Sequence, residues 1–236
     1  MSVKRSPGLH DPFRTAPAYS ISEAARYAGT TPATVRRWIK GYDSAMGHME
    51  PVFEDKDSAD GSTPRLSFLD LAEIIVAVKF TQLGGKLDKV RFARGRAHQK
   101  WPALQYPFAS LRMKAIGGEL LHVVDEEYGG MALALSIGGP HGDQYVLPNL
   151  VAEALDLFEF DKETELAIRW FPAGRDSAVV VDPRFAGGRP TIKGRGVTVD
   201  SIFRRWTKGG EKQRAIADDL ELSVDEVEDA LRFAAA

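Results

Sequence analysis

The sequence predicts an α+β fold in which helical segments at both ends flank a mixed middle region. Near the N-terminus, small and apolar residues recur at helical spacing on both sides of a glycine. In the middle, short β-like runs alternate with Gly-rich turns, and near the C-terminus a basic Gly/Pro-rich stretch precedes three further helical segments. The predicted parts are a flexible arm (1–18), a helical domain with a β wing (19–100), a linker with a small α+β domain (101–178), and a trihelical domain that follows a strand and a Gly-rich loop (179–236).

The composition argues against several classes of protein. Of the 236 residues 44% are hydrophobic, which is ordinary for a globular core, and the net charge of −2 hides a strong segregation of charge along the chain. Without cysteine there is no disulfide, thiol nucleophile or thiolate metal site, and the five histidines show no ligand spacing. The apolar runs are far shorter than the ~20 residues that span a bilayer, and no apolar signal segment is present. We therefore expect a cytoplasmic protein with no metal, cofactor or membrane partner.

Two helices joined by a tight turn are predicted between Tyr19 and Tyr42. Ser20 and Glu23 form a capping box at the start of the first helix, which should end near Gly29. Thr31 as N-cap and Pro32 at the first position start a second helix that runs to about Gly41. Ala25 supplies the close contact between the helices, Gly29 the turn, and Ala28, Val35 and Trp38 the buried seam. The spacing of Ala25, Gly29, Val35 and Trp38 recurs near the C-terminus as Ala217, Glu221, Val227 and Ala230. Because the second copy is acidic and the first is basic, we expect them to contact different partners.

The outer face of the second predicted helix is basic. Its inner face is the apolar seam that a crossing pair of helices needs. The residues left to point outward are Thr34, Arg36, Arg37 and Lys40. Arginine can bond guanine edges with its fork of donors, whereas lysine suits a phosphate. Crossing geometry together with charge favours DNA binding over the alternative, a merely solvated helix face.

The segments that follow are predicted to be a polar loop or wing (43–64) and two helices (66–80 and 86–100). In this order, Tyr19 to Lys100 resembles the MerR-like winged helix-turn-helix regulators, with VRRWIKGY as the recognition helix and Arg65 leading from the wing into the next helix. The resemblance implies that a homodimer binds double-stranded operator DNA at paired half-sites, with Arg65 as a further contact. The wing is longer than is usual in that family, and the helix after Lys86 is short for its dimerising coiled coil.

The segment 79–100 carries one acid, Asp88, and seven bases. These bases are Lys79, Lys86, Lys89, Arg91, Arg94, Arg96 and Lys100. They either approach the DNA backbone, which would make affinity fall steeply with salt, or only solubilise an exposed helix. The next region is the least informative, with the β-like runs LLHVV, MALALSI and ELAIRWF and one helix after Pro148.

The C-terminal region combines a basic loop with acidic helices. A strand VVVDP and the stretch FAGGRPTIKGRGVTV precede helices predicted over 199–208, 211–220 and 223–233, and no base occurs from Ala215 to Ala230. Repulsion makes DNA binding by this face unfavourable, although such a surface can also be merely solubilising. The segment from Val179 onward resembles the small domain of unknown function found alone or at the end of VapB-type antitoxins, whose hallmarks are the Gly-Gly-basic-Pro turn and the Ile-Lys-Gly step. That family continues with Thr-Arg, whereas this chain has Arg195-Gly196.

This resemblance implies an antitoxin paired with a VapC-type, PIN-like ribonuclease, whose clustered carboxylates hold divalent metal. A base placed among those carboxylates would compete with metal and RNA, and the candidates are Arg189, Lys193 and Arg195. Alternatively, the glycines could let the backbone approach a phosphate, or the loop could be a purely structural turn.

We therefore predict a non-enzymatic antitoxin of a type II toxin–antitoxin system that represses its own operon and neutralises a toxin. The alternative is a MerR-like transcription regulator whose middle domain senses a small molecule. An enzyme is less favoured because no nucleophile with a base and no paired acid motif is found, although distant groups can assemble in a fold.

Overall fold

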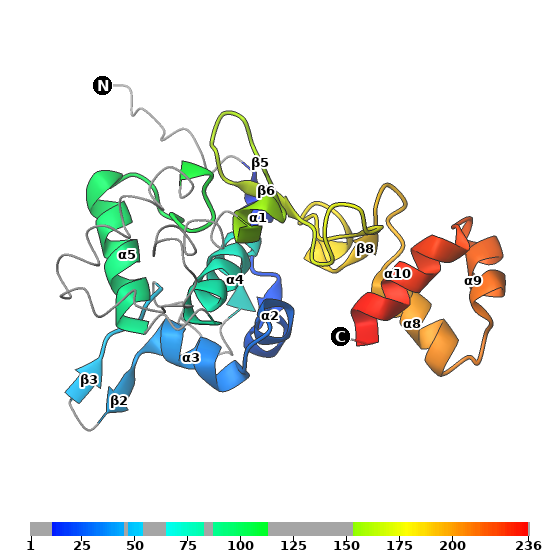
Figure 1. Ribbon diagram of the computed structural model, residues 1–236, viewed down its shortest axis with the longest axis horizontal. Coiled ribbons are helices and arrows are strands. Elements are labelled where there is room, and N and C mark those ends of the chain that lie inside the picture. The colour runs from blue at the N-terminus through cyan, green and yellow to red at the C-terminus, as the bar shows by residue number, and fades with distance from the viewer. Residues whose placement is uncertain (1–10, 45–46, 54–64, 83–86, 113–152, 236) are drawn as a thin grey trace, which may run out of the picture. The chain divides into compact units, whose positions relative to one another are not determined.

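The computed structural model describes residues 11–44, 47–53, 65–82, 87–112 and 153–235, and its helices and two-stranded sheets confirm a mixed α and β protein (Figure 1). The chain divides into two compact units. One comprises residues 1–156 and 160–167, and the other comprises 157–159 and 168–236.

The first unit begins with a short helix, α1 (Pro12–Thr15), inside the segment that the sequence assigns to a flexible arm. The Asp11 side chain caps this helix by accepting a hydrogen bond from Phe13 N, 3.1 Å away. Arg14 is only 5% exposed and donates to Thr164 Oγ1 over 3.3 Å. The cap and the proline at the first helical position are local signals for a helix start, but four residues are too few to show helical periodicity.

The predicted pair of helices is present as α2 (Ile21–Ala28) and α3 (Pro32–Lys40). Ser20 N donates to Glu23 Oε2 over 2.8 Å and Glu23 N donates to Ser20 Oγ over 3.2 Å, so both halves of the capping box form. Gly29 ends α2 in the left-handed region, at φ 68°. The close contact and the seam are buried, with Ala25 and Val35 at 0% exposure and Trp38 at 4%, whereas the turn residue Gly29 is exposed. The sequence predicts these two helices to within a residue because cap, turn and seam all agree.

Two small antiparallel sheets accompany the helix pair. Strands β2 (Tyr42–Ser44) and β3 (Gly47–Met49) form a hairpin directly after α3, with Tyr42 opposite Met49. Strand β1 (Tyr19–Ser20) pairs with β4 (Arg65–Leu66), so residues 65–66 lie beside the start of α2. Residues 54–64 of the predicted wing lie outside the described residues.

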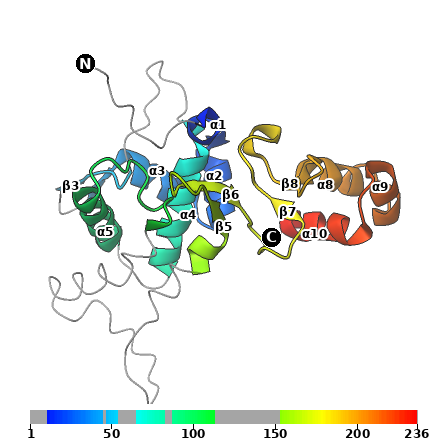
Figure 2. The ribbon, with the colours of Figure 1, turned by 90° about the horizontal axis from the view of Figure 1, so that it is seen from above.

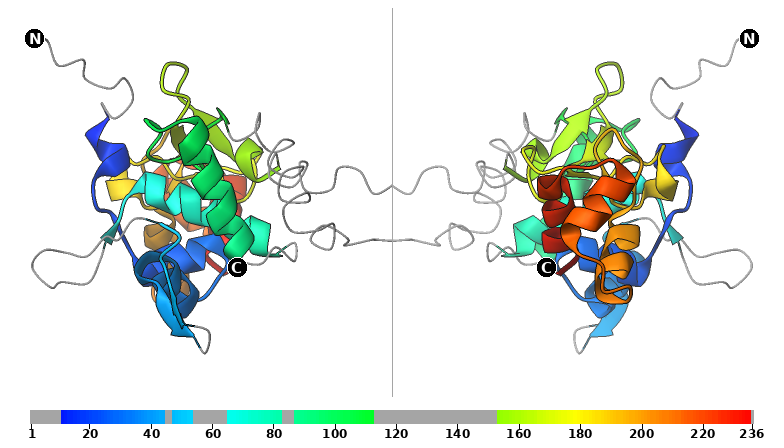
Figure 3. Two further views of the ribbon diagram at one scale, coloured as in Figure 1. Left: turned by 90° about the vertical axis from the view of Figure 1, so that its left-hand side faces the viewer. Right: turned by 90° about the vertical axis from the view of Figure 1, so that its right-hand side faces the viewer.

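Helix α4 (Phe68–Gln82) packs against α2 and also contacts α5 (Leu87–Lys100), which Figure 3 shows beside it. Residues 68–78 of α4 are all buried, which makes this helix the centre of the first unit. Its start is fixed by a second capping box, in which Ser67 N donates to Asp70 Oδ2 over 2.8 Å and Asp70 N donates to Ser67 Oγ over 3.2 Å.

The predicted middle domain falls mostly on residues 113–152, which include LLHVV and MALALSI and lie outside the described residues. After it, residues 153–156 are helical, and the run ELAIRWF contributes β6 (Ala167–Trp170), which pairs with β5 (Phe158–Phe160). On the other side of the gap, residues 101–112 belong to the first unit.

The second unit contains β7 (Val179–Val180), a 3₁₀ turn η1 (Ala186–Gly188), and β8 (Thr191–Ile192), which pairs with β7. Helices α8 (Val199–Thr207), α9 (Gln213–Leu220) and α10 (Val224–Ala235) follow at the positions predicted from the sequence. Helix α10 packs against both α8 and α9 (Figure 2). Val179 and Ile192 belong to the same core as the three helices, which ties both ends of the basic loop to the helical part. None of the described helices is long and apolar enough to cross a membrane.

Candidate functional site

The basic outer face of α3 lies as the sequence predicts. Arg36, Arg37 and Lys40 are exposed, and Thr34 is half-buried with its hydroxyl 2.9 Å from that of Thr31. Arg37 also lies over the Tyr42 ring at 5.5 Å, which orients its guanidinium towards the start of the hairpin. Among the described residues, neither Arg36 nor Arg37 forms an ion pair with a carboxylate. The face therefore presents unneutralised positive charge to solvent.

Arg65 is exposed but has a structural contact. Its Nη2 donates to the carbonyl oxygen of Ala18 over 2.7 Å, beside the β1–β4 pairing. It also lies near Glu23, where burial tends to raise the pKa of the carboxyl, but hydrogen bonds from Ser20 and the charge of Arg65 produce a net lowering of that pKa. Arg65 thus stabilises the start of α2 while its side chain stays exposed.

Two arginines of the basic segment 79–100 make contacts inside the first unit, a structural role that neither DNA binding nor solubilisation includes. Arg94 is 9% exposed, and its guanidinium lies 3.1 Å from the Glu73 carboxylate inside the first unit. Arg91 of α5 donates two hydrogen bonds to the carbonyl of Glu50, over 2.7 and 3.0 Å. These bonds connect α5 to the residue that follows the β2–β3 hairpin. These two arginines are structural, whereas the side chains of Lys86, Lys89, Arg96 and Lys100 lie outside the described residues.

A charged cluster that sequence reasoning missed lies at the start of the basic loop of the second unit. Asp182 is 2% exposed and accepts from Arg169 Nε over 2.8 Å and from Arg184 Nη2 over 2.6 Å. Burial raises the pKa of this carboxyl, but the hydrogen bonds from Arg184 and Arg169 outweigh burial, and the net pKa is lowered. Arg169 is also 3.1 Å from Glu159, so the cations of this cluster are neutralised within the protein.

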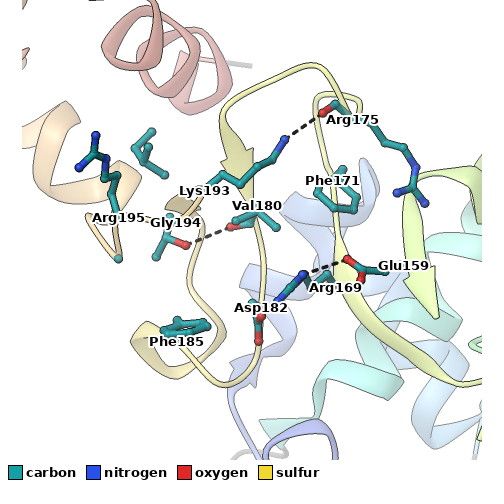
Figure 4. Close-up of a pocket in the computed structure, with 13 residues that line it drawn as sticks. Glu159, Arg169, Phe171, Arg175, Val180, Asp182, Phe185, Lys193, Gly194 and Arg195 are labelled. Carbon is teal, nitrogen blue, oxygen red and sulfur yellow. Dashed lines mark hydrogen bonds and ion pairs between the residues drawn. The ribbon is translucent and has the colours of Figure 1, made fainter. Parts of the chain in front are cut away.

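Beside the cluster is a cavity of about 690 Å³, entirely within the second unit (Figure 4). Its apolar lining comes from Phe171, Val180, Phe185 and Ile192. Its charged lining comes from two acids and four bases, namely Glu159, Asp182, Arg169, Arg175, Lys193 and Arg195. The size lies within the range of about 300–1,000 Å³ that is typical of ligand pockets.

The three predicted toxin-contacting residues, Arg189, Lys193 and Arg195, are all exposed. Lys193 Nζ donates to the carbonyl of Arg175 over 2.9 Å and lies over the Phe171 ring at 5.3 Å. Arg189 Nε donates to the carbonyl of Ala186 over 3.1 Å and lies outside the cavity lining, whereas Lys193 and Arg195 belong to it. None of the three forms an ion pair with a described carboxylate, in contrast to Arg169 and Arg184.

The acidic helices present a different surface. Arg205 of α8 pairs with Glu211 at 2.5 Å and with Asp219 at 2.6 Å, so part of the acidic charge is used to join α8 to α9. Asp218, Glu221 and Asp225 are exposed, and they keep the surface of α9 and α10 negative. Within the described residues, no group of three His, Cys, Asp or Glu side chains is placed to hold a metal ion.

Comparisons with known proteins connect these features. Residues 179–234, which comprise the basic loop and the three helices, match the family described as "Protein of unknown function (DUF433)". A solved structure, "X-ray crystal structure of Rv2018 from Mycobacterium tuberculosis", is similar with a TM-score of 0.71 and 26% identity, over 92% of this chain and 97% of that chain.

Two proteins of Mycobacterium tuberculosis are similar in sequence. "Uncharacterized protein Rv2308" is 26% identical over 91% of this chain and 89% of its own length. The other, named "Putative antitoxin VapB45", is 28% identical over 93% of this chain and 95% of its own length. The chain is therefore similar, over nearly its whole length, to a protein named as an antitoxin.

Proposed function

We propose that this chain is the antitoxin of a type II toxin–antitoxin system, which binds a PIN-like ribonuclease toxin and represses its own operon by binding DNA. The observation that carries the proposal is the similarity to a protein named as an antitoxin, because it extends over 93% of this chain and so includes both units. A similarity confined to the DUF433 segment would leave the first unit without a role.

The DNA-binding surface is α3, acting as the recognition helix of a MerR-like winged helix-turn-helix. In support, α2 and α3 meet through a left-handed turn at Gly29, and the β2–β3 hairpin follows α3 as a wing would. Arg36 and Arg37 are the candidates for base edges, and Thr34, Lys40 and Arg65 are the candidates for phosphates. Because such domains bind paired half-sites, the DNA-binding form is a homodimer.

The toxin-binding surface is the basic loop between β7 and α8. Arg189, Lys193 and Arg195 support this assignment because they are exposed and are not paired with described carboxylates. A PIN-like active site is a cluster of carboxylates that holds divalent metal, and a guanidinium or ammonium group inserted there would displace the metal and block RNA.

Co-expression with the product of the neighbouring gene tests the proposal. We expect a stable complex in which the ribonuclease activity of that product is suppressed, and we expect the complex to shift the operon's promoter DNA. Replacing Arg189 and Arg195 together by alanine should restore ribonuclease activity, and undiminished inhibition would remove these two residues from the contact. The absence of any complex between the wild-type proteins would refute the antitoxin function itself.

A further inference from the structure

The cavity of the second unit has one neutral side and one cationic side. On the neutral side, the positive charges of Arg169 and Arg184 balance the negative charges of Asp182 and Glu159. On the cationic side, Lys193 interacts with a carbonyl and an aromatic face, neither of which removes its charge, and Arg195 pairs with no described carboxylate. In Figure 4, Arg195 lies well apart from Glu159 and from Arg175. The Lys193–Arg195 turn therefore brings positive charge to the cavity that no described carboxylate neutralises.

An aromatic side chain lies at the same cavity and is exposed to water. Phe185 is 53% exposed although it belongs to the cavity lining, and its described ring contact is the Arg184 guanidinium at 6.0 Å. Aromatic residues next to a concave surface are frequent anchors of protein interfaces because a partner can bury them completely. The backbone at Phe185 is fixed by a hydrogen bond from its own N–H to the carbonyl of Asp182 over 3.0 Å, so the residue that carries the exposed ring is joined to the paired cluster.

We propose that this cavity is the docking site for an acidic segment of the toxin. An apolar side chain of that segment packs against Phe185 and the apolar lining, and flanking carboxylates pair with Lys193 and Arg195. The proposal rests on the proposed antitoxin function and deepens it, because it separates Lys193 and Arg195 from Arg189 and adds Phe185 to the contact.

Charge and exposure together favour a protein segment over a free small molecule. Small-molecule sites bury most of their ligand, whereas the residues from Lys193 to Gly196 that line this cavity are all exposed. A β-carbon at Gly194 or Gly196 would meet no atom within 4 Å, so the space next to this turn is open to a partner backbone. A carboxylate-bearing segment matches the unpaired positive charge, and a basic segment would be repelled by it.

The test measures binding of the co-purified toxin to the full chain by biolayer interferometry at low and high salt. Phe185→Ala should raise the dissociation rate constant about tenfold, as expected for loss of a buried anchor. Lys193→Ala with Arg195→Ala should lower the association rate constant about tenfold at low salt, and the difference should shrink at high salt. Arg189→Ala should change both rate constants less than either of these variants.

Matched controls are available in the same chain. Phe13 is 54% exposed in the first unit and does not line the cavity, so Phe13→Ala removes an equally exposed ring that is not part of the proposed site. Lys208 and Arg214 are exposed in the second unit outside the cavity lining, so their double alanine variant removes the same charge as the Lys193 and Arg195 pair. Both controls should bind the toxin as the wild type does.

The outcomes separate the two proposals. Absence of a wild-type complex refutes the antitoxin function and this site with it. A wild-type complex that the Phe185 and Lys193/Arg195 variants form unchanged refutes the site alone. A photo-reactive benzoylphenylalanine at position 185 should cross-link to a toxin peptide that contains Asp or Glu. Cross-linking elsewhere, or stabilisation of the isolated chain by millimolar AMP that Phe185→Ala abolishes, would overturn the docking of a protein segment.

Discussion

Glu221 ends α9 in the same left-handed backbone conformation in which Gly29 ends α2. The φ and ψ angles are 54° and 39° at Glu221, and 68° and 41° at Gly29. In both turns, the N–H of the cap residue bonds to the carbonyl of the alanine four positions earlier, Ala217 or Ala25. The two motifs that the sequence relates by spacing are therefore related in turn geometry as well, although one has a side chain where the other has none.

Glycine at position 221 should stabilise the protein. A non-glycine residue pays about 1 kcal/mol or more for the left-handed region, whereas glycine enters it freely. Glu221 is exposed, so Glu221→Gly should lose little contact and raise the free energy of unfolding by about 1 kcal/mol. Denaturant titration measures this change. The reciprocal variant Gly29→Ala should lose about 1 kcal/mol, and equal stability of all three proteins would contradict the assigned strain.

The sequence predicts most of the helices because their signals are local. Capping boxes at Ser20 and Ser223, the Thr31–Pro32 start and the repeated inner spacing all act within a few residues, and each appears in the structure. The β1–β4 pair is different, since Tyr19 and Leu66 become neighbours only through tertiary contacts. Two residues per strand also carry too little alternation to be recognised from sequence.

Charge reversal on α3 should weaken DNA binding. Replacing Arg36 and Arg37 by glutamate turns two positive charges of the proposed recognition face into two negative ones, and both arginines are exposed. We expect operator affinity to fall by at least about a hundredfold, and the dependence of affinity on salt to become shallower by up to about two ion equivalents. Fluorescence anisotropy with promoter DNA at several salt concentrations measures both quantities.

A matched control for this prediction is the reversal of Lys208 and Arg214, which changes the net charge equally in the second unit. If that control weakens DNA binding as much as the reversal on α3 does, the effect comes from net charge, and the proposal that α3 is the recognition helix is wrong. Toxin binding should be unchanged in the α3 variant, because the toxin contacts are proposed for the other unit.

Asp182→Asn should destabilise the second unit. The carboxylate accepts from both Arg169 and Arg184, and a neutral amide cannot satisfy two guanidinium groups in the same way. We expect a loss of about 2 kcal/mol at neutral pH, measured by thermal or denaturant unfolding. The pKa of Asp182 is lowered in the folded state, so its contribution is present above the ordinary pKa of 3.8 and is lost as pH falls through the folded value. The difference between the two proteins should therefore vanish in acid, and a difference that persists there would have another cause.

The candidate site in the second unit could be predicted only in part, for a physical reason. Lys193 and Arg195 lie on one turn, so their shared exposure follows from a glycine-rich sequence. Arg169 lies in β6, whereas Asp182 follows β7 thirteen residues later, and no local pattern shows that the arginine neutralises the aspartate. The exposure of Phe185 also could not be predicted from the sequence, because an aromatic residue is expected to be buried in a core.

Glu73 gives the first unit a pH-dependent stability in an unusual direction. Its side chain is buried, with exposure of 1%, and it accepts from Phe108 N over 3.0 Å and from Arg94 Nε over 3.2 Å. Burial raises the pKa of the carboxyl from its ordinary 4.5 to about 7, against the opposing charge of Arg94 and the hydrogen bond from Phe108. Asp70, on the same helix, adds to the rise.

The sign of the effect follows from proton linkage. Between pH 4.5 and about 7 the folded state holds a proton on Glu73 that the unfolded state has released, so the free energy of unfolding falls as pH rises through this window. Glu73→Gln removes that titration. The variant loses one acceptor for Arg94 and should be less stable overall, but its stability should decline less between pH 5 and about pH 7.5 than that of the wild type. Thermal unfolding across this range checks the prediction, and parallel curves for the two proteins would show that Glu73 is ionised throughout.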